Sequence, residues 1–315
     1  MLIIDTQDCF IEQGATTSGD AGSLAVADTA AILPLINQIR AEKGCLFDVV
    51  VRSQDYHPAG HISFGPTHGL EPFAHLAGLG ELPLTCVNPS SGMSADASCC
   101  PTFHLQPYNC TQRLCPSVDT ASADLTAQVM ASPACTICQD TPEECFETTQ
   151  AMWTNHCLQS GDSGFPPTLV NQDSDIVVQK GGNAYVDSYS AFADNTKRLQ
   201  TKLDGILKEN DVDTIYILGI ATDYCVYYST IDGLGLGYEM NLVLDATRGI
   251  APDTVELALA DMLASGAKVV NSTELLAMAC PAPTSGGAAW NNYQASSILV
   301  SNIMVLLFTA GIFVK

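Results

Sequence analysis

Short apolar runs alternate with amphipathic segments along the chain. The apolar runs are of strand length and rich in β-branched side chains, as in strands buried on both faces of a sheet. The segments between them place apolar residues at helical spacing. We expect strands at 2–5, 47–51, 175–180, 215–218, 239–245 and 267–270, and helices at 25–41, 195–209, 253–264 and 272–278, with a further helix beginning near Cys225. This alternation predicts an α/β fold with a doubly wound, mostly parallel sheet and helices on both faces.

The composition divides the chain into four parts. Gly, Pro, Ser and Thr are frequent in the middle of the chain, which predicts an insertion with little regular structure beyond a helix at 121–131. After Cys280 the residues become small and flexible, and the chain ends in an apolar run. The predicted parts are one folded domain made of 1–64 and 150–279, a Cys-rich insertion at 65–149, a linker at 280–297 and a hydrophobic tail at 298–315.

The C-terminal end resembles an attachment signal. Small residues, a polar spacer and a terminal apolar tail follow one another in the order of a GPI-attachment signal. The tail is at the short edge of what a spanning helix needs, so a tail-anchored helix is the alternative. Either way, we expect contact with a membrane through this tail.

The 13 cysteines bear on the compartment. Eight of them lie between Cys86 and Cys145, and such a dense, even cluster favours disulfides and an oxidising compartment. Zinc binding through Cys135 and Cys138 is the alternative. Sequons at Asn109 and Asn271 agree with a secretory route. Met1 leads straight into a strand without a signal peptide, so we expect a secretory or cell-surface protein with a truncated N-terminus, or otherwise a cytosolic one.

The charge excludes one class of partner. The formal net charge is −22, with 12 Lys and Arg against 34 Asp and Glu. No basic patch is available to release counterions from a phosphate backbone or an anionic membrane surface. We therefore expect no nucleic-acid partner.

The strand at 215–218 leads to the first candidate for chemistry. Gly219 ends the strand, Thr222 or Asp223 can cap the following helix, and Cys225 then falls in its first turn. The N-terminal end of a helix favours a thiolate and offers free backbone N–H groups that can hold an oxyanion. Cys225 is therefore a candidate nucleophile, and a buried structural cysteine is the alternative.

Further candidates follow other strands. Asp5 and Lys180 each end a predicted strand, and open α/β sheets place their sites at the carboxyl ends of strands. Asp55 and His57 alternate on an extended segment, so both can point to one side and form half of a divalent metal site. The alternatives are a turn carboxylate for Asp5, a solvated lysine for Lys180, and a polar loop for the segment with Asp55 and His57.

These residues lie in strings that resemble the nicotinamidase/pyrazinamidase family of the isochorismatase-like cysteine hydrolases. The strings occur in the family's order, and the resemblance covers most of 1–64 and 150–275. They are Asp5-Thr-Gln-Asp-Cys-Phe10, Asp55-Tyr-His-Pro, His61-Ile-Ser-Phe64, Trp153-Thr-Asn-His-Cys157, Lys180 with Asp187-Ser-Tyr-Ser-Ala-Phe192, Gly219-Ile-Ala-Thr-Asp-Tyr-Cys225 and Asp245-Ala-Thr-Arg-Gly249. The departures are Asp8 where the family has Asn, Cys9 where it has Asp, and Thr154 where it has Pro.

The resemblance implies a three-layer fold and a role for each matching residue. It implies a triad of Asp5, Lys180 and Cys225, with Asp5 as acid and base. It also implies a cis peptide at Ile220–Ala221 and an oxyanion hole formed by the amides of Ala221 and Cys225. Phe10 and Trp153 match walls of the substrate pocket. Asp55, His57 and His156 match metal ligands, and His61 matches a ligand found in some members only. Cys157, Asp245 and Arg248 are expected to be structural.

The expected reaction is hydrolysis of nicotinamide to nicotinate and ammonia through a thioester on Cys225. One divalent metal ion is expected, with zinc first and iron or manganese also compatible. Two other functions stay open: an isochorismatase-like amidohydrolase acting on a ureido or carbamoyl substrate, and a non-catalytic cell-surface protein on this scaffold. The insertion would be a disulfide-stapled surface excursion, or a lid or partner-binding module, since both its ends lie beside metal-site residues. A homo-oligomer is left open.

Overall fold

A six-stranded sheet, parallel throughout, forms the centre of the molecule in the computed structural model, which describes residues 1–68, 72–73, 82–84, 148–184, 186–195, 197 and 199–281. The strand order is β5-β2-β1-β6-β7-β8. The strands are β1 (Leu2–Ile4), β2 (Val51–Asp55), β5 (Ile176–Lys180), β6 (Thr214–Ile220), β7 (Glu239–Arg248) and β8 (Lys268–Val270). β1 and β6 are the two central strands, so both of their faces are covered.

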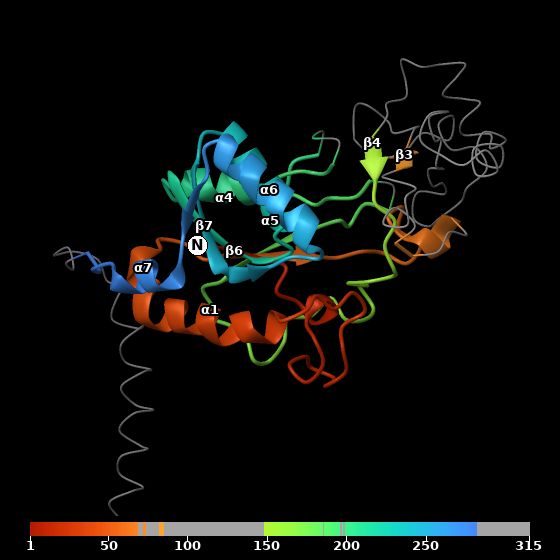
Figure 1. The fold of residues 1–315 in the computed structure, drawn as a ribbon, viewed down its shortest axis with the longest axis horizontal. Helices are drawn as coiled ribbons and strands as arrows, with labels where there is room; N and C mark the ends of the chain where they lie inside the picture. Colours follow the sequence, from red (N-terminus) through yellow and green to blue (C-terminus); the bar gives the residue numbers. More distant parts are fainter. Residues whose placement is uncertain are drawn as a thin grey trace, which may run out of the picture.

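Helices cover both faces of this sheet, as Figure 1 shows. On one face lie α1 (Thr29–Lys43) and α7 (Ser272–Ala277), and on the other α4 (Leu203–Glu209), α5 (Cys225–Gly235) and α6 (Pro252–Ala264). Short 3-10 turns are η1 (Asp8–Phe10), η2 (Gly44–Leu46) and η3 (Gly65–His68). The predicted α/β fold, a parallel sheet between two helical layers, is confirmed.

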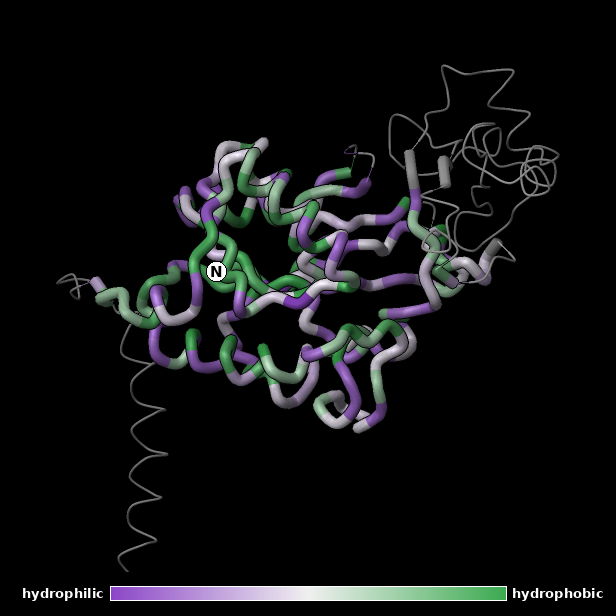
Figure 2. The backbone as a smooth tube through the Cα atoms, viewed as in Figure 1, coloured by the Kyte–Doolittle hydropathy of each residue, from purple (hydrophilic) through white to green (hydrophobic). Residues whose placement is uncertain are grey.

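The central strands divide their apolar side chains between two cores. Along β6, Ile215 and Ile217 pack on the face of α4–α6, whereas Leu218 and Ile220 pack on the face of α1. In Figure 2 the central strands are coloured mainly as hydrophobic residues, whereas the helices on either side alternate between hydrophobic and hydrophilic residues. Burial of both strand faces explains the continuous apolar runs in the sequence.

Three predictions about elements were wrong. The second strand is β2 at Val51–Asp55 instead of 47–51, because Val51 is the residue that pairs with Leu2 of β1. The helix expected at 195–209 is shorter and begins at Leu203, as α4. The chain before it folds back on itself, because Ala193 and Gln200 form an antiparallel bridge.

The third wrong prediction concerns the cap of α5. The N-cap residue is Tyr224, and no side chain caps the helix. The Asp223 carboxylate turns to the start of α6 instead, where it accepts hydrogen bonds from the Ile250 amide at 2.9 Å and the Thr254 hydroxyl at 2.5 Å.

The two ends of the predicted insertion meet beside each other. Phe64 forms a parallel bridge with Trp153, and the Gly65 amide donates to the Trp153 carbonyl at 2.8 Å. In the described part of this region, β3 (Leu82–Leu84) pairs antiparallel with β4 (Thr148–Gln150). The predicted helix at 121–131, the cysteines from Cys86 to Cys145, the linker beyond residue 281 and the C-terminal tail lie outside the described residues.

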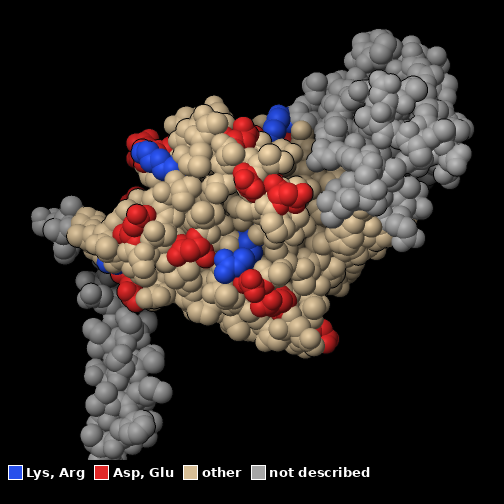
Figure 3. All heavy atoms as spheres, in the orientation of Figure 1, with Lys and Arg blue, Asp and Glu red and all other residues tan. Residues whose placement is uncertain are grey.

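The surface in Figure 3 carries scattered acidic side chains with few Lys or Arg side chains between them. Among the described residues, the charged side chains on this face are thus mostly acidic. Within the part of the chain that the structure describes, no helix is both long enough and apolar enough to cross a membrane.

Candidate active site and metal centre

Cys225 begins α5, directly after the loop that leaves the central strand β6. Gly219 lies inside β6, one residue before its end, and does not end the strand as expected. Its φ is +118°, and it pairs with Ile4 so closely that a Cβ would collide with the Ile4 backbone. Cys225 is buried, and it is the free cysteine among the described residues. The turn thus places a buried thiol beside the end of β1, where Asp5 follows.

Lys180 brings the candidate triad together. Its Nζ lies 2.9 Å from Asp5 Oδ2 and 3.4 Å from Cys225 Sγ. It also donates to Asp55 Oδ1 at 3.0 Å and to the Ser188 carbonyl at 2.9 Å. Asp5 in turn accepts a hydrogen bond from the Ser53 hydroxyl at 2.6 Å. The three residues that the sequence singled out from three strand ends therefore lie in one buried cluster.

Burial and charge set the protonation of this cluster. Burial raises the pKa of Asp5, against the opposing effect of Lys180. Burial also raises the pKa of the Cys225 thiol well above its usual value. Burial alone would lower the pKa of Lys180, but Asp5 and Asp55 outweigh it and raise that pKa well above its usual value. Burial therefore opposes the effect of the helix N-terminus and favours the thiol form of Cys225 in the resting site.

Two backbone amides point to a second function for the same turn. The Ile220–Ala221 peptide is cis, as the resemblance implies. Among the described residues, neither the Ala221 amide nor the Cys225 amide donates to a protein acceptor, whereas the Thr222 amide donates to the Arg248 carbonyl. Two unoccupied donors flanking a thiol can hold the oxygen of a carbonyl under attack.

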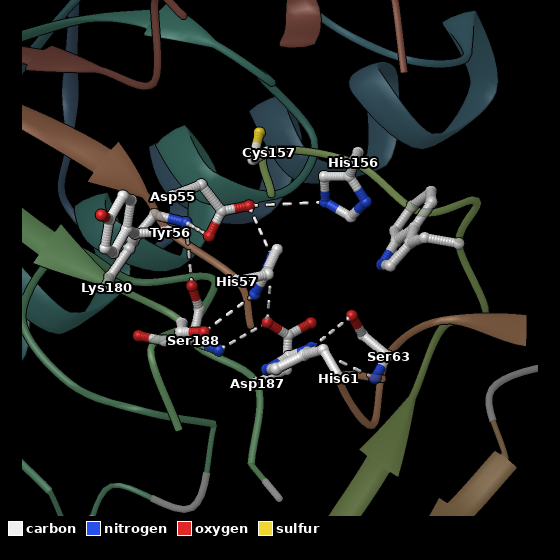
Figure 4. Close-up of polar contacts among 12 residues, drawn as sticks. Asp55, Tyr56, His57, His61, Ser63, His156, Cys157, Lys180, Asp187 and Ser188 are labelled. Carbon is white, nitrogen blue, oxygen red and sulfur yellow. Dashed lines mark hydrogen bonds and ion pairs between the residues drawn. The ribbon is translucent and has the colours of Figure 1, made fainter. Parts of the chain in front are cut away.

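Asp55, His57 and His156 form a second cluster next to the first. Asp55 Oδ2 lies 2.8 Å from His57 Nε2 and 3.4 Å from His156 Nε2, as the dashed lines in Figure 4 show. The Nδ1 atoms of the two rings lie 2.9 Å from the Gly181 carbonyl and 2.8 Å from the Thr154 carbonyl. These carbonyls fix the tautomer and leave both Nε2 atoms facing the carboxylate, which is how proteins orient metal-ligating histidines.

His61 places a third imidazole ring beside that of His57. It is fully buried, its Nδ1 lies 2.7 Å from the Ser63 hydroxyl, and its Nε2 has no hydrogen-bond partner. Its ring lies 4.0 Å from that of His57, centroid to centroid. Burial, followed by the charge of His57, lowers the pKa of His61 well below its usual value. Ligand atoms of His57, His61 and Asp187 lie within 4.8 Å of one another, as do those of Asp55, His156 and the disulfide-bonded Cys157. Imidazole and carboxylate ligands of this kind fit a divalent cation such as zinc.

A pocket opens above both clusters. It is lined by Phe10, Trp153, His156, Tyr189, Tyr224 and Cys225, among others. Trp153 packs edge-on against Tyr224 at 4.8 Å, and Tyr189 packs edge-on against Tyr224 at 5.4 Å. The pocket therefore joins aromatic walls, a thiol and the histidine cluster. The expected wall residues Phe10 and Trp153 both line it.

Sequence reasoning missed five residues that line this pocket: Leu24, Asp187, Tyr189, Tyr224 and Ile250. Asp187, Tyr189 and Tyr224 lie inside the strings on which the resemblance rests, so their position there was the available signal. Leu24 and Ile250 lie outside those strings. Asp187 Oδ1 also lies 4.0 Å from His57 Nε2.

Two disulfides lie in the described part of the chain. Cys9 pairs with Cys157, and Cys45 pairs with Cys280. Cys157 was expected to be structural, but its partner was not identified, because 148 positions separate the two cysteines and spacing gives no signal of pairing.

Comparisons with known proteins agree on one family. The isochorismatase domain matches residues 121–274. The nicotinamidase of Acinetobacter baylyi is 30% identical over 278 residues, which cover 88% of this chain and 94% of that protein. The solved nicotinamidase/pyrazinamidase of Acinetobacter baumanii is 29% identical with a TM-score of 0.58, and covers 87% of this chain and 96% of that one.

A pyrazinamidase of Pyrococcus horikoshii, solved in complex with zinc, shares the fold at 22% identity and a TM-score of 0.51, covering 86% of this chain and 97% of that one. From the full-length similarity and the matched domain, the chain belongs to the nicotinamidase/pyrazinamidase family of isochorismatase-like hydrolases, enzymes that cleave amide C–N bonds.

Proposed function

We propose that the protein hydrolyses nicotinamide to nicotinate and ammonia through a thioester on Cys225. The observation that carries the proposal is the convergence on Lys180, whose Nζ lies within hydrogen-bonding distance of Asp5, Asp55 and Cys225. Lys180 thus contacts the proposed acid Asp5, the proposed nucleophile Cys225 and the carboxylate of Asp55 beside the histidines. The relatives named nicotinamidase support the choice of substrate.

The chemistry follows from the protonation of the cluster. An amide has a poor leaving group, so attack by a neutral thiol needs a base that later returns the proton. The raised pKa of Asp5, set by burial, suits it to take the proton of Cys225 and deliver it to the departing ammonia. Lys180 keeps the Asp5 carboxylate oriented, and the amides of Ala221 and Cys225 hold the oxyanion. Water then cleaves the thioester, with Asp5 taking a proton from the water and returning it to the departing Cys225 sulfur, which restores the thiol.

A divalent metal ion would be held by Asp55, His57 and His156, with His61 as a possible further ligand. The donor set of imidazole and carboxylate suits zinc, and iron or manganese are compatible with it. When bound, such an ion supplies an electrophilic anchor for a pyridine nitrogen or for the hydrolytic water. His156 lines the same pocket as Cys225, so a flat ring between Phe10 and Trp153 can reach both.

The direct test is ammonia release from nicotinamide by the purified protein. We expect turnover that a chelator suppresses and added zinc restores, and no turnover by Cys225→Ala. A protein that leaves nicotinamide intact but hydrolyses a ureido or carbamoyl compound would overturn the substrate. Absence of hydrolysis of either class by the metal-loaded protein would favour a non-catalytic role. Cys225→Ala with more than a tenth of the parent activity would exclude the thioester mechanism.

A further inference from the structure

The Cys9–Cys157 disulfide joins two segments that each carry a pocket residue. Cys9 lies in η1 and is followed by Phe10, and Cys157 directly follows His156. Both cysteines are fully buried, and their Cα atoms are 5.1 Å apart. Figure 4 shows the Cys157 sulfur next to the histidine cluster. The bond is thus one residue away from a pocket wall on one side and from a candidate metal ligand on the other.

Each cysteine is also fixed to the backbone around the site. The Cys157 carbonyl accepts a hydrogen bond from the His57 amide at 3.0 Å. The Cys9 amide donates to the Asp162 carbonyl at 3.0 Å, and its carbonyl accepts from the Leu24 amide at 2.8 Å. Across the bond, the rings of Phe10 and His156 lie 5.6 Å apart. The disulfide therefore locks His156 against both Phe10 and the segment that bears His57.

The long chain between the metal ligands is where a covalent lock can add to the order of the site. Asp55 and His57 lie before residues 65–149, and His156 lies after them. Bringing the ends of a long segment together costs more conformational entropy than closing a short one. A cross-link that spans 148 positions removes much of that freedom from the unfolded chain.

We propose that Cys9 and Cys157 are positioning residues whose disulfide holds His156 in the metal site and Phe10 in the pocket wall. The inference rests on the proposed metal site and deepens it. Affinity for zinc then depends on the oxidation state of this bond. A dithiol supplies two electrons and two protons, the disulfide becomes two thiols, and the dithiol becomes a cyclic disulfide. With the bond open, His156 loses its covalent tie to the Phe10 segment and keeps the hydrogen bonds of its own segment, such as that between its Nδ1 and the Thr154 carbonyl.

The test compares two double variants of the full chain. Cys9→Ala/Cys157→Ala removes the bond at the site without leaving a thiol near the metal. Cys45→Ala/Cys280→Ala is the matched control, because it removes a disulfide of even longer span, 235 positions, that contributes no residue to the pocket. Zinc affinity is measured by competition with a chelating dye, and kcat and KM are measured on nicotinamide.

We expect the site variant to bind zinc at least about tenfold more weakly, the scale of losing an outer support of a metal ligand. The KM for nicotinamide should rise as zinc binding weakens. The kcat should change less, because the elements that position Asp5, Lys180 and Cys225 (the end of β1, β5 and α5) are not altered. The control variant should match the parent in zinc affinity. Equal zinc affinity in the parent and the site variant would overturn the inference while leaving the metal site standing. A parent that binds no zinc would overturn both.

Reduction of the unmutated protein gives an independent measurement if the site variant fails to fold. Mild dithiol treatment is followed by alkylation and mass spectrometry, which report when Cys9 and Cys157 have opened. We expect zinc affinity to fall in step with their alkylation and to recover on reoxidation. Unchanged affinity after both thiols are alkylated would overturn the inference. So would a thiolate-to-cobalt absorption band in the reduced, cobalt-loaded protein, because Cys157 would then be acting as a ligand.

Discussion

Asp55 divides its two carboxylate oxygens between the two halves of the site. Oδ1 accepts from Lys180, and Oδ2 faces the Nε2 atoms of His57 and His156. Burial alone would raise the pKa of Asp55, but His57 and Lys180 lower it well below its usual value. Lys180 therefore connects the candidate triad to the candidate metal centre through one side chain. A change at Lys180 should affect catalysis and stability together.

Lys180→Ala is the corresponding prediction. The substitution leaves Asp5 and Asp55 buried without their shared cation, and breaking a buried pair costs about 3–5 kcal/mol. We expect kcat to fall at least about a hundredfold, the scale of acid–base contributions, and the free energy of unfolding to fall as well. Steady-state kinetics and urea unfolding measure the two effects. A variant with unchanged stability would mean that Lys180 does not compensate the two carboxylates.

The pH dependence of turnover tests Asp5. Asp5 must be deprotonated to accept the thiol proton, and burial raises its pKa above the ordinary value of 3.8. Activity is therefore expected to be lost as the pH falls through this raised pKa, so the acid limb of kcat/KM should lie above pH 3.8. Asp5→Asn should reduce kcat at least about a hundredfold at every pH. An acid limb at the ordinary value, or an active Asn variant, would assign the base elsewhere.

His156→Ala tests the metal centre at a residue far along the chain from its partners. The substitution removes one of the two Nε2 atoms that face Asp55 Oδ2. We expect the purified variant to hold less than a tenth of the metal found in the parent and to bind nicotinamide more weakly. Elemental analysis and KM decide the matter. Full metal content in the variant would show that the ligand set is wrong.

At the scale of elements, the close pairing of β1 and β6 sets the distance between Asp5 and Cys225. Gly219 lies opposite Ile4, one residue before Asp5, and has no room for a Cβ. A side chain there must push the two strands apart at the point where both enter the site. The geometry of the triad thus depends on a residue that carries no functional group.

Gly219→Ala should therefore lower both stability and kcat. The positive φ adds strain to the collision with the Ile4 backbone. Gly205→Ala in α4 is the control, since a Cβ there meets nothing within 4 Å and alanine stabilises a helix interior by roughly 0.5–1 kcal/mol. Thermal unfolding and kinetics compare the two. Equal effects of both substitutions would contradict the role given to the β1–β6 pairing.

The elements also show what the sequence could predict. Periodicity located the sheet, because β1 and β6 are buried on both faces and read as continuous apolar runs. It failed at β2, which ends in the polar residues Arg52 to Asp55 because the strand continues to the site edge of the sheet. It also failed at Asp223, whose carboxylate binds the start of α6 through a tertiary contact that no local pattern contains.

At the scale of the whole molecule, the site depends on contacts between distant segments. The strings around Asp5, Asp55, Lys180 and Cys225 could be found one by one, and the parallel topology explains why they meet at one edge. The pairing of Cys9 with Cys157 and of Cys45 with Cys280 could not be deduced, because the partners lie 148 and 235 positions apart in the sequence. These pairings bear on where the protein works.

We propose that the mature protein lies outside the cytosol, held to a membrane by its C-terminal end. Disulfides are rare in the cytosol, and two occur in the described residues in addition to the cysteine cluster at 86–145. The chemistry requires Cys225 to stay reduced in the same compartment. Every other cysteine among the described residues is paired, so none of them is left to form a bond with Cys225.

Thiol labelling of the native protein without reductant, followed by mass spectrometry, tests this proposal. We expect Cys225 to be labelled, and its labelling to be slowed by a bound substrate analogue, because its sulfur lines the pocket. Cys9, Cys45, Cys157 and Cys280 should be labelled only after reduction, and so should the cysteines between Cys86 and Cys145. Mostly labelled cysteines in that cluster, in protein isolated without exposure to air, would contradict the oxidising compartment and favour a cytosolic enzyme with a metal-binding insertion.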